Sequence, residues 1–225
     1  MARLFYLLII LFGISGSANA QTYLSASKSD PMASKILNGI KKNYDSFNSL
    51  YIEFELLLEL PKSDKEVQEG FVKQKGDKFA AKIDGQEIYC NGSYISVFLP
   101  SNNEVQINDY DPNEAEGIMT PKDLLQIYEG GDYAYAITGS ETLQGRIFKT
   151  IEFKPLDPNS EYAKLRLYAD DKKKEAYRIK VFSKNGSRYT LTVNKLIPNK
   201  DFADSEFEFD KNKHPNVFIE DLRID

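Results

Sequence analysis

The chain has 225 residues, of which 41% are hydrophobic and 28% charged, with one cysteine, one histidine and a formal net charge of −5. This composition is typical of a globular protein and excludes a disordered, collagen-like or disulfide-stapled chain. The lone cysteine and lone histidine exclude a zinc site built from clusters of these residues. The acidic balance argues against a nucleic-acid partner, because binding to phosphates requires a net basic face.

The first twenty residues have the pattern of a secretory signal peptide. Residues 1–3 form a short cationic start, Leu4–Phe12 is an unbroken apolar run of nine, and residues 18–20 are a small-x-small cleavage pattern. Nine apolar residues are too few to cross a hydrocarbon core of about 30 Å. We therefore expect residues 1–20 to be removed. Residues 21–225 are then a single exported domain without a lipid anchor, because no cysteine follows the apolar run.

A helix is predicted to begin at Pro31. Asp30 and Pro31 are typical of an N-cap and a first helical residue. Gly39 costs roughly 1 kcal/mol relative to alanine, so packing has to hold this helix. An apolar stripe of helical spacing supplies the surface for that packing through Met32, Ala33, Ile36, Leu37, Ile40 and Tyr44. These features predict an amphipathic helix of about four turns.

From Leu50 onward the apolar residues alternate with a period of two, which predicts a half-buried antiparallel strand. Its apolar side consists of Leu50, Ile52, Phe54, Leu56, Leu58 and Leu60. Turns are predicted at Asn91-Gly92, of type I′, and at Asn185-Gly186. Further short strands are predicted over Val67–Lys75, Lys78–Ile83, Gln86–Cys90, Ser93–Leu99, Glu104–Asn108, Tyr133–Thr138, Leu143–Lys154, Lys164–Ala169, Ala176–Phe182, Arg188–Ile197 and Glu206–Phe209.

A second helix is predicted in the middle of the chain. Thr120 and Pro121 open it, Leu124, Leu125 and Tyr128 follow, and two glycines stop it. Many short strands with two inserted helices predict a mainly β, single-domain sandwich or barrel.

No catalytic or metal-binding motif stands out. The acidic loop from Asp109 has oxygen-bearing side chains at alternate positions, but Glu114 replaces the glycine and Thr120 replaces the bidentate glutamate of a calcium loop. The sequence contains no G-x-S-x-G elbow, no H-E-x-x-H and no glycine-rich phosphate loop. We therefore expect no enzyme, no metal and no cofactor.

The apolar side of the strand from Leu50 has two interpretations. Ordinary core packing explains it, and so does an open sheet that holds a hydrophobic ligand. The pattern alone does not decide between them.

Taken together, the segments resemble the outer-membrane lipoprotein carrier protein family (LolA-like) over residues 21–225. The resemblance is carried, in chain order, by Asp30-Pro31, Ile36-Leu37, Ile40, Phe47–Phe54, Gly70-Phe71-Val72-Lys73, Lys78-Phe79, Asn91-Gly92, Tyr94–Pro100, Glu104-Val105, Thr120-Pro121, Leu124-Leu125, Gly145, Gly186, Tyr189, Phe207–Phe209 and Asp221-Leu222-Arg223. It implies a half-open antiparallel β-barrel with helices that form a lid over an apolar cavity.

The resemblance also implies positions for the binding site. Ile36, Ile40, Leu124 and Leu125 match the family's lid, and Phe79, Ala81 and Ile83 match a strand that lines its cavity. With the apolar patterns above, the expected cavity residues are Ile52, Phe54, Leu56, Leu58, Phe71, Phe79, Ala81, Ile83, Tyr94 and Phe98. The expected lid residues are Met32, Ile36, Leu37, Ile40, Leu124, Leu125 and Tyr128.

Three positions depart from the family. Gln74 stands where an arginine that helps to hold the lid is common, so Gln74 is only a candidate lid contact. Ala81 and Ser96 stand where bulkier aromatic residues are common, which implies a cavity of different shape.

Members of the family carry acylated lipoproteins through the periplasm, from an inner-membrane ABC-type transporter to the outer membrane. The resemblance therefore implies a monomeric periplasmic chaperone that binds acylated lipoproteins, such a transporter and, where one exists, an outer-membrane acceptor. A non-enzymatic binding protein for a small hydrophobic or lipid ligand is the alternative.

Overall fold

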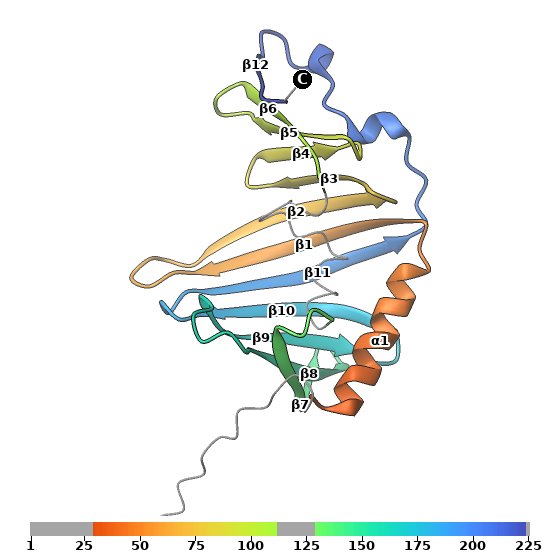
Figure 1. Ribbon diagram of the computed structural model, residues 1–225, viewed down its shortest axis with the longest axis vertical. Coiled ribbons are helices and arrows are strands. Elements are labelled where there is room, and N and C mark those ends of the chain that lie inside the picture. Colours follow the sequence, from red (N-terminus) through yellow and green to blue (C-terminus); the bar gives the residue numbers. More distant parts are fainter. Residues whose placement is uncertain (1–28, 112–128, 224–225) are drawn as a thin grey trace, which may run out of the picture.

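The computed structural model describes residues 29–111 and 129–223, which form one 12-stranded sheet with a helix, α1 (Pro31–Asp45), against it (Figure 1). The strand order is β12-β6-β5-β4-β3-β2-β1-β11-β10-β9-β8-β7. The strands span Ser49–Glu59 (β1), Glu66–Lys75 (β2), Lys78–Ile83 (β3), Gln86–Cys90 (β4), Tyr94–Leu99 (β5), Glu104–Asp109 (β6), Tyr133–Leu143 (β7), Arg146–Pro155 (β8), Tyr162–Asp170 (β9), Glu175–Ser183 (β10), Arg188–Pro198 (β11) and Phe218–Asp221 (β12). The sheet is open, because β12 and β7 are its two edges.

Two antiparallel meanders meet at the centre of the sheet. β1 to β6 form one, β7 to β11 form the other, and β11 pairs with β1 from Leu50↔Pro198 to Glu59↔Arg188. β12 then returns to pair in parallel with β6 at the far edge. β1 and β11, the first and the last long strand in the chain, therefore join the two meanders.

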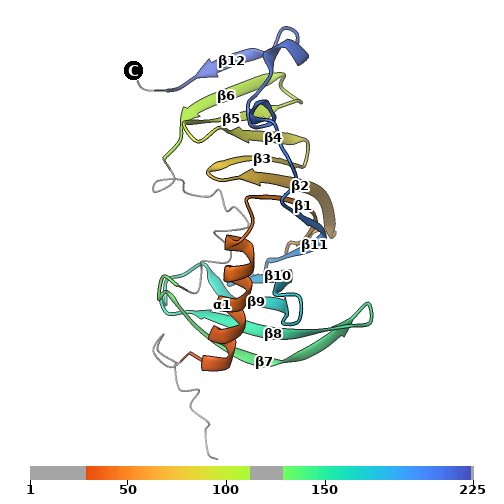
Figure 2. The ribbon, with the colours of Figure 1, turned by 90° about the vertical axis from the view of Figure 1, so that its right-hand side faces the viewer.

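Different segments cover the two faces of the sheet. α1 lies across β7–β10, and its apolar residues pack against Ile151 of β8 and Leu165 and Leu167 of β9 (Figure 2). We call this side the α1 face. On the opposite side, the outer face, Phe202 and Phe207 from the segment after β11 pack against Ala80 of β3. This segment contains two short 3-10 helices, η2 (Asp204–Phe207) and η3 (Lys211–Lys213).

The structure confirms the expected fold class, a mainly β, half-open antiparallel sheet with a helix over one face. It also confirms the first helix, with Asp30 as N-cap and Pro31 as first residue. The second expected helix, residues 120–128, lies outside the described residues.

Three expectations about local structure were wrong. Residues 206–209 do not form a strand: Asp204–Phe207 is a 3-10 turn. β8 begins at Arg146, because Gln144 and Gly145 both take positive φ and make the turn after β7. Asn91-Gly92 is not a type I′ turn, which needs two positive φ angles, because only Gly92 has one. The Asn91 side chain instead accepts hydrogen bonds from the amides of Ser93 and Tyr94.

Candidate functional site

The N-terminus of α1 is fastened to the edge strand β7. The Asp30 carboxylate accepts hydrogen bonds from the Met32 amide at 2.8 Å, which caps the helix, and from the Ile137 amide of β7 at 3.2 Å. The Asp30 amide donates to the Tyr135 carbonyl at 2.9 Å. The bonds from Ile137 and Met32 lower the pKa of the Asp30 carboxyl, because they stabilise its charged form.

The C-terminus of α1 is fastened to the turn between β9 and β10. The Asn43 side-chain amide donates to the Lys174 carbonyl at 3.0 Å. Burial raises the pKa of Tyr44, whose ring packs both on the core under α1 and on the apolar cluster of β1. Tyr44 therefore links the two apolar regions of the α1 face.

The expected lid residues of α1 belong to the core. Ile36, Leu37 and Ile40 are buried against β8–β10, and Ile40 is 0% exposed. Met32 points away from the sheet and is 57% exposed. Among the described residues, these four side chains do not meet the β3 residues expected in the cavity. The other expected lid residues, Leu124, Leu125 and Tyr128, lie outside the described part of the chain.

Seven of the expected cavity residues share the α1 face on β1 and β3. They are Ile52, Phe54, Leu56, Leu58, Phe79, Ala81 and Ile83. Ile52, Phe54 and Phe79 are buried, whereas Leu56, Leu58, Ala81 and Ile83 remain half-buried. These half-buried side chains form an apolar surface on the α1 face of β1 and β3.

The structure places Phe71, Tyr94 and Phe98 on the outer face, which corrects their expected place in the cavity. Phe71 pairs with Glu53 and Lys82. Its side chain therefore lies on the opposite face from that of its neighbour Val72, which pairs with Ile52. The Phe98 ring contacts Phe209 and His214 of the segment after β11. The Arg223 guanidinium lies 5.2 Å from the centre of the Tyr94 ring.

The register adds apolar residues that sequence reasoning did not select. Ile52 pairs with Val72 of β2. Successive cross-strand pairs extend this row through Ala81, Ile88 and Val97 of β3, β4 and β5. Alternation within each strand was the available signal, but only cross-strand pairing shows which alternate set shares a face with Ile52.

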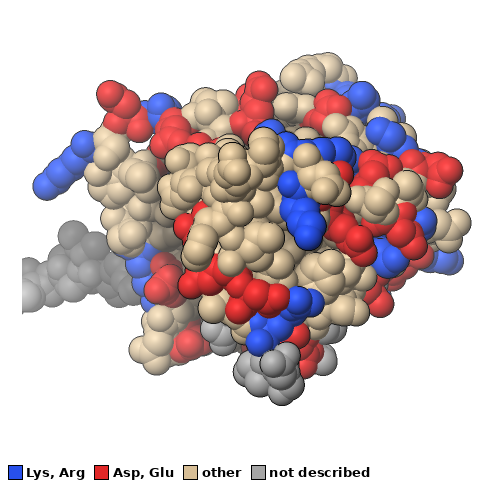
Figure 3. All heavy atoms as spheres, turned by 90° about the horizontal axis from the view of Figure 1, so that it is seen from above, with Lys and Arg blue, Asp and Glu red and all other residues tan. Residues whose placement is uncertain are grey.

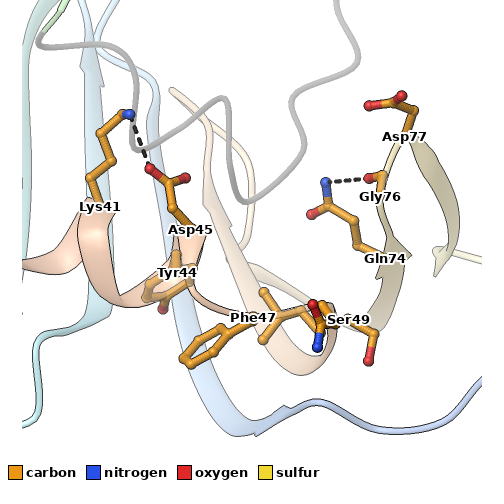
Figure 4. Close-up of a pocket in the computed structure, with 10 residues that line it drawn as sticks. Lys41, Tyr44, Asp45, Phe47, Ser49, Gln74, Gly76 and Asp77 are labelled. Atoms are coloured by element: carbon orange, nitrogen blue, oxygen red, sulfur yellow. Dashed lines mark hydrogen bonds and ion pairs between the residues drawn. The ribbon is translucent and has the colours of Figure 1, made fainter.

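A hollow lies between the C-terminal end of α1 and the β2–β3 turn (Figure 4). Its volume is about 400 Å³, and it is lined by Lys41, Tyr44, Asp45, Phe47, Asn48, Ser49, Leu50, Gln74, Gly76 and Asp77. Gln74 does not contact α1: its side-chain amide donates to the Gly76 carbonyl at 3.5 Å, and the hollow separates it from Lys41 and Asp45. Asp45 raises the pKa of Lys41 by a hydrogen bond and by its charge, and Glu129 adds to the effect.

Neither a metal cluster nor a spanning helix is found in the described residues. Between 29 and 111 and between 129 and 223, no three His, Cys, Asp or Glu side chains gather to hold a metal ion. Within the same ranges, no helix is long and apolar enough to cross a membrane.

Solved structures share this fold. An uncharacterized conserved protein from Thermus thermophilus matches with a TM-score of 0.56 at 10% sequence identity, over 86% of this chain and 99% of that chain. The mainly β, open sheet with a helix over one face that the sequence predicted is thus found in a solved structure as well. At this identity the likeness concerns the fold alone.

Two further solved structures resemble the chain more weakly. A LolA superfamily protein from Nitrosomonas europaea matches with a TM-score of 0.40 at 16% identity, over 79% of this chain and 97% of that chain. LprF from Mycobacterium bovis matches with a TM-score of 0.47 at 14% identity, over 78% and 98% respectively. No protein-family model and no curated protein matches the sequence.

Proposed function

We propose that the protein is a periplasmic carrier that binds the acyl chains of lipoproteins on its α1 face and carries them from the inner to the outer membrane. The observation that supports this proposal is the half-buried apolar surface of β1–β5, which includes Leu56, Ala81 and Ile83 and which α1 leaves uncovered. Its partners are then acylated lipoproteins, an ABC-type transporter that releases them and an outer-membrane acceptor.

The energetics of acyl transfer explain the need for such a surface. Each CH₂ moved from lipid into water costs about 0.8 kcal/mol, so three sixteen-carbon chains cost on the order of 35 kcal/mol. Spontaneous crossing of an aqueous compartment is negligible at that cost. A half-buried surface shields the chains and still lets them leave, since it does not enclose them completely.

Native mass spectrometry tests the proposal. Residues 21–225, the expected exported form, are mixed with a triacylated lipopeptide and with its deacylated form. We expect a one-to-one complex with the acylated lipopeptide alone. Equal binding of both forms, or of neither, would rule out recognition of acyl chains.

A pair of variants in β3 locates the surface. Ala81→Glu places a carboxylate among the apolar side chains of the α1 face, and we expect it to abolish the complex because a charge cannot be buried there unpaired. Lys82→Gln changes the net charge equally on the outer face and is expected to leave binding unchanged. Similar losses in both variants would place the binding site elsewhere.

A second candidate is binding of a small hydrophobic ligand, for which the hollow beside Tyr44 offers room and an apolar lining of Tyr44, Phe47 and Leu50 among polar residues. The volume of the hollow, about 400 Å³, lies in the usual range for small-molecule sites. A single fatty acid that binds as tightly as the triacylated lipopeptide, and competes with it, would favour this candidate over the carrier.

A further inference from the structure

The outer face of β8–β11 carries an excess of cations that the net charge of the whole chain conceals. Arg166 of β9 lies directly opposite Lys180 of β10. Lys164 and Arg188 lie on either side of Phe182. We call this set the basic surface, and it consists of Lys154, Lys164, Arg166, Arg178, Lys180 and Arg188.

Carboxylates neutralise only part of the basic surface. Glu152 accepts from Lys164 at 3.0 Å and also from Arg166. Arg178 donates to the Thr192 hydroxyl at 3.0 Å. Glu59 of β1 lies opposite Arg188, but its ion pair is with Lys65. The hydrogen bond from Lys65 lowers the pKa of the Glu59 carboxyl most, and the charges of Arg188 and Lys180 are close enough to lower it further. Like charges directly opposite one another destabilise a sheet. Glu152 already offsets the charge of Arg166, so an external anion would act on Arg178, Lys180 and Arg188.

Aromatic rings hold these cations across the sheet. The Lys164 ammonium lies 5.1 Å from the centre of the Phe182 ring. Arg178 and Lys180 lie 5.7 and 5.8 Å from the centre of the Tyr168 ring. Cation–π contacts of this kind keep the long side chains extended over the strands. The result is a two-dimensional array of positive charge over four strands.

Three turns touch one another at the end of the sheet where β1 and β10 end and β9 and β11 begin. They join β1 to β2, β8 to β9 and β10 to β11, and they lie side by side in Figure 1. The Lys184 amide donates to the Glu161 carbonyl at 2.9 Å, and a Cβ placed on Gly186 would lie 3.5 Å from Pro61. Large apolar residues are exposed here: Leu60 at 40%, Leu156 at 38% and Tyr162 at 39%.

The β12 end of the molecule also exposes large apolar side chains, Phe218, Ile219 and Leu222. Seen from that end, however, acidic and basic side chains are interspersed over the surface (Figure 3). The basic surface is therefore a feature of β8–β11, and the three turns adjoin it.

We propose that the basic surface and the three turns dock the protein on an anionic phospholipid bilayer. The cations lie over the lipid phosphates, and Leu60, Leu156 and Tyr162 enter the boundary between headgroups and acyl chains. Exposed apolar side chains beside a basic array fit such a boundary, whereas a soluble acidic protein segment would use the charges and leave the apolar turns in water. Docking through the outer face leaves the α1 face free, so this proposal does not depend on the proposed function.

Vesicle sedimentation tests the docking. Residues 21–225 are mixed with vesicles of phosphatidylethanolamine and phosphatidylglycerol, or with vesicles of phosphatidylcholine alone. We expect sedimentation with the anionic vesicles only, and release at high salt because salt screens the attraction. Each Lys or Arg near an anionic bilayer contributes about fivefold to binding, so Arg178→Gln/Lys180→Gln/Arg188→Gln should weaken it on the order of 100-fold.

A matched triple variant controls for net charge. Lys35→Gln/Lys172→Gln/Lys173→Gln removes three exposed cations from α1 and from the β9–β10 turn, outside the basic surface. We expect it to bind anionic vesicles like the wild type. Should the Arg178 substitution disturb the fold by circular dichroism, the Lys180→Gln/Arg188→Gln variant alone should still weaken binding about 25-fold.

Several results would overturn the docking. Equal sedimentation with both kinds of vesicle would show that binding does not depend on lipid charge. No sedimentation with either kind would show that the protein does not bind a bilayer. An equal loss of vesicle binding in both triple variants would show that binding depends on net charge and not on the basic surface. Binding to soluble poly-glutamate without binding to vesicles would make the surface a site for an acidic protein segment instead.

Discussion

At the scale of single residues, a close approach between Phe54 and Gly70 sets how β1 packs on β2. A Cβ built on Gly70 would lie 2.5 Å from the Lys82 carbonyl oxygen and 2.6 Å from Cζ of Phe54. The backbone of β3 cannot give way without breaking its pairing with β2. We therefore predict that Gly70→Ala lowers the free energy of unfolding by about 1–3 kcal/mol. Urea denaturation followed by circular dichroism measures the change.

A second glycine provides the matched control. A Cβ on Gly39 in α1 would lie 3.2 Å from Cδ of the flexible Lys174 side chain, which can move aside. Alanine is also the better helix former by about 1 kcal/mol. Gly39→Ala should leave the stability unchanged or raise it. Destabilisation by both substitutions alike would show that the Gly70 contact is not specific.

The Asp30 carboxylate makes stability depend on pH. Hydrogen bonds from the Ile137 and Met32 amides lower its pKa in the folded protein, so its charge contributes stability at a pH above the usual value of 3.8. That contribution is lost as the pH falls through the lowered value. Asp30→Asn should therefore be less stable than the wild type at neutral pH, and the difference should shrink below about pH 4. Urea titrations at several pH values give this difference, and one that does not vary with pH would contradict the assignment.

At the scale of whole elements, α1 behaves as part of the core. Ile40 is fully buried against β8–β10, whereas Met32 on the same helix faces away from the sheet. Ile40→Ala should cost about 2–5 kcal/mol of stability, and Met32→Ala should change it by less than about 0.5 kcal/mol. Thermal and urea unfolding measure both. If Ile40→Ala instead costs little stability but weakens lipopeptide binding, α1 would be a movable lid and not part of the core.

The sequence was sufficient for elements with a long, regular pattern and insufficient where both sides of a strand are apolar. The spacing after Asp30 predicted α1, and the alternation from Leu50 predicted β1. In β5, however, Phe98 and Val97 are both apolar, because the segment after β11 covers the outer face that Phe98 occupies. Alternation divides such a strand into two sets but does not tell which set faces inward.

Short segments were missed for a related reason. Asp204–Phe207 has too few residues to separate a 3-10 turn from a strand by periodicity. The basic surface was invisible because its cations come from four strands that are distant in the sequence. Lys164 and Arg188 each looked like an ordinary exposed charge until β10 brought both of them to Phe182.

At the scale of the whole molecule, α1 and the segment after β11 cover opposite faces of different halves of the sheet, although each half also has a buried cluster on its other face. The core of the β7–β10 half lies under α1 and includes Ile40. A core of the β2–β5 half lies under the segment after β11 and includes Phe207. Among the described residues, the central pair β1 and β11 joins the halves by bonds over nearly its whole length, and Tyr44 packs against the apolar clusters of both.

This continuity predicts that residues 21–225 unfold as one cooperative domain. Ile40→Ala and Phe207→Ala lie on different faces, so each should destabilise the same single transition, by about 2–5 and 3–5 kcal/mol respectively. Their effects should add within about 0.5 kcal/mol in the double variant, with the denaturant slope unchanged. Urea unfolding followed by circular dichroism and by tyrosine fluorescence measures the transitions. Two separated transitions, each moved by one substitution only, would show that β1 and β11 connect two independent domains, because a break at the central pair is the route by which the halves can unfold separately.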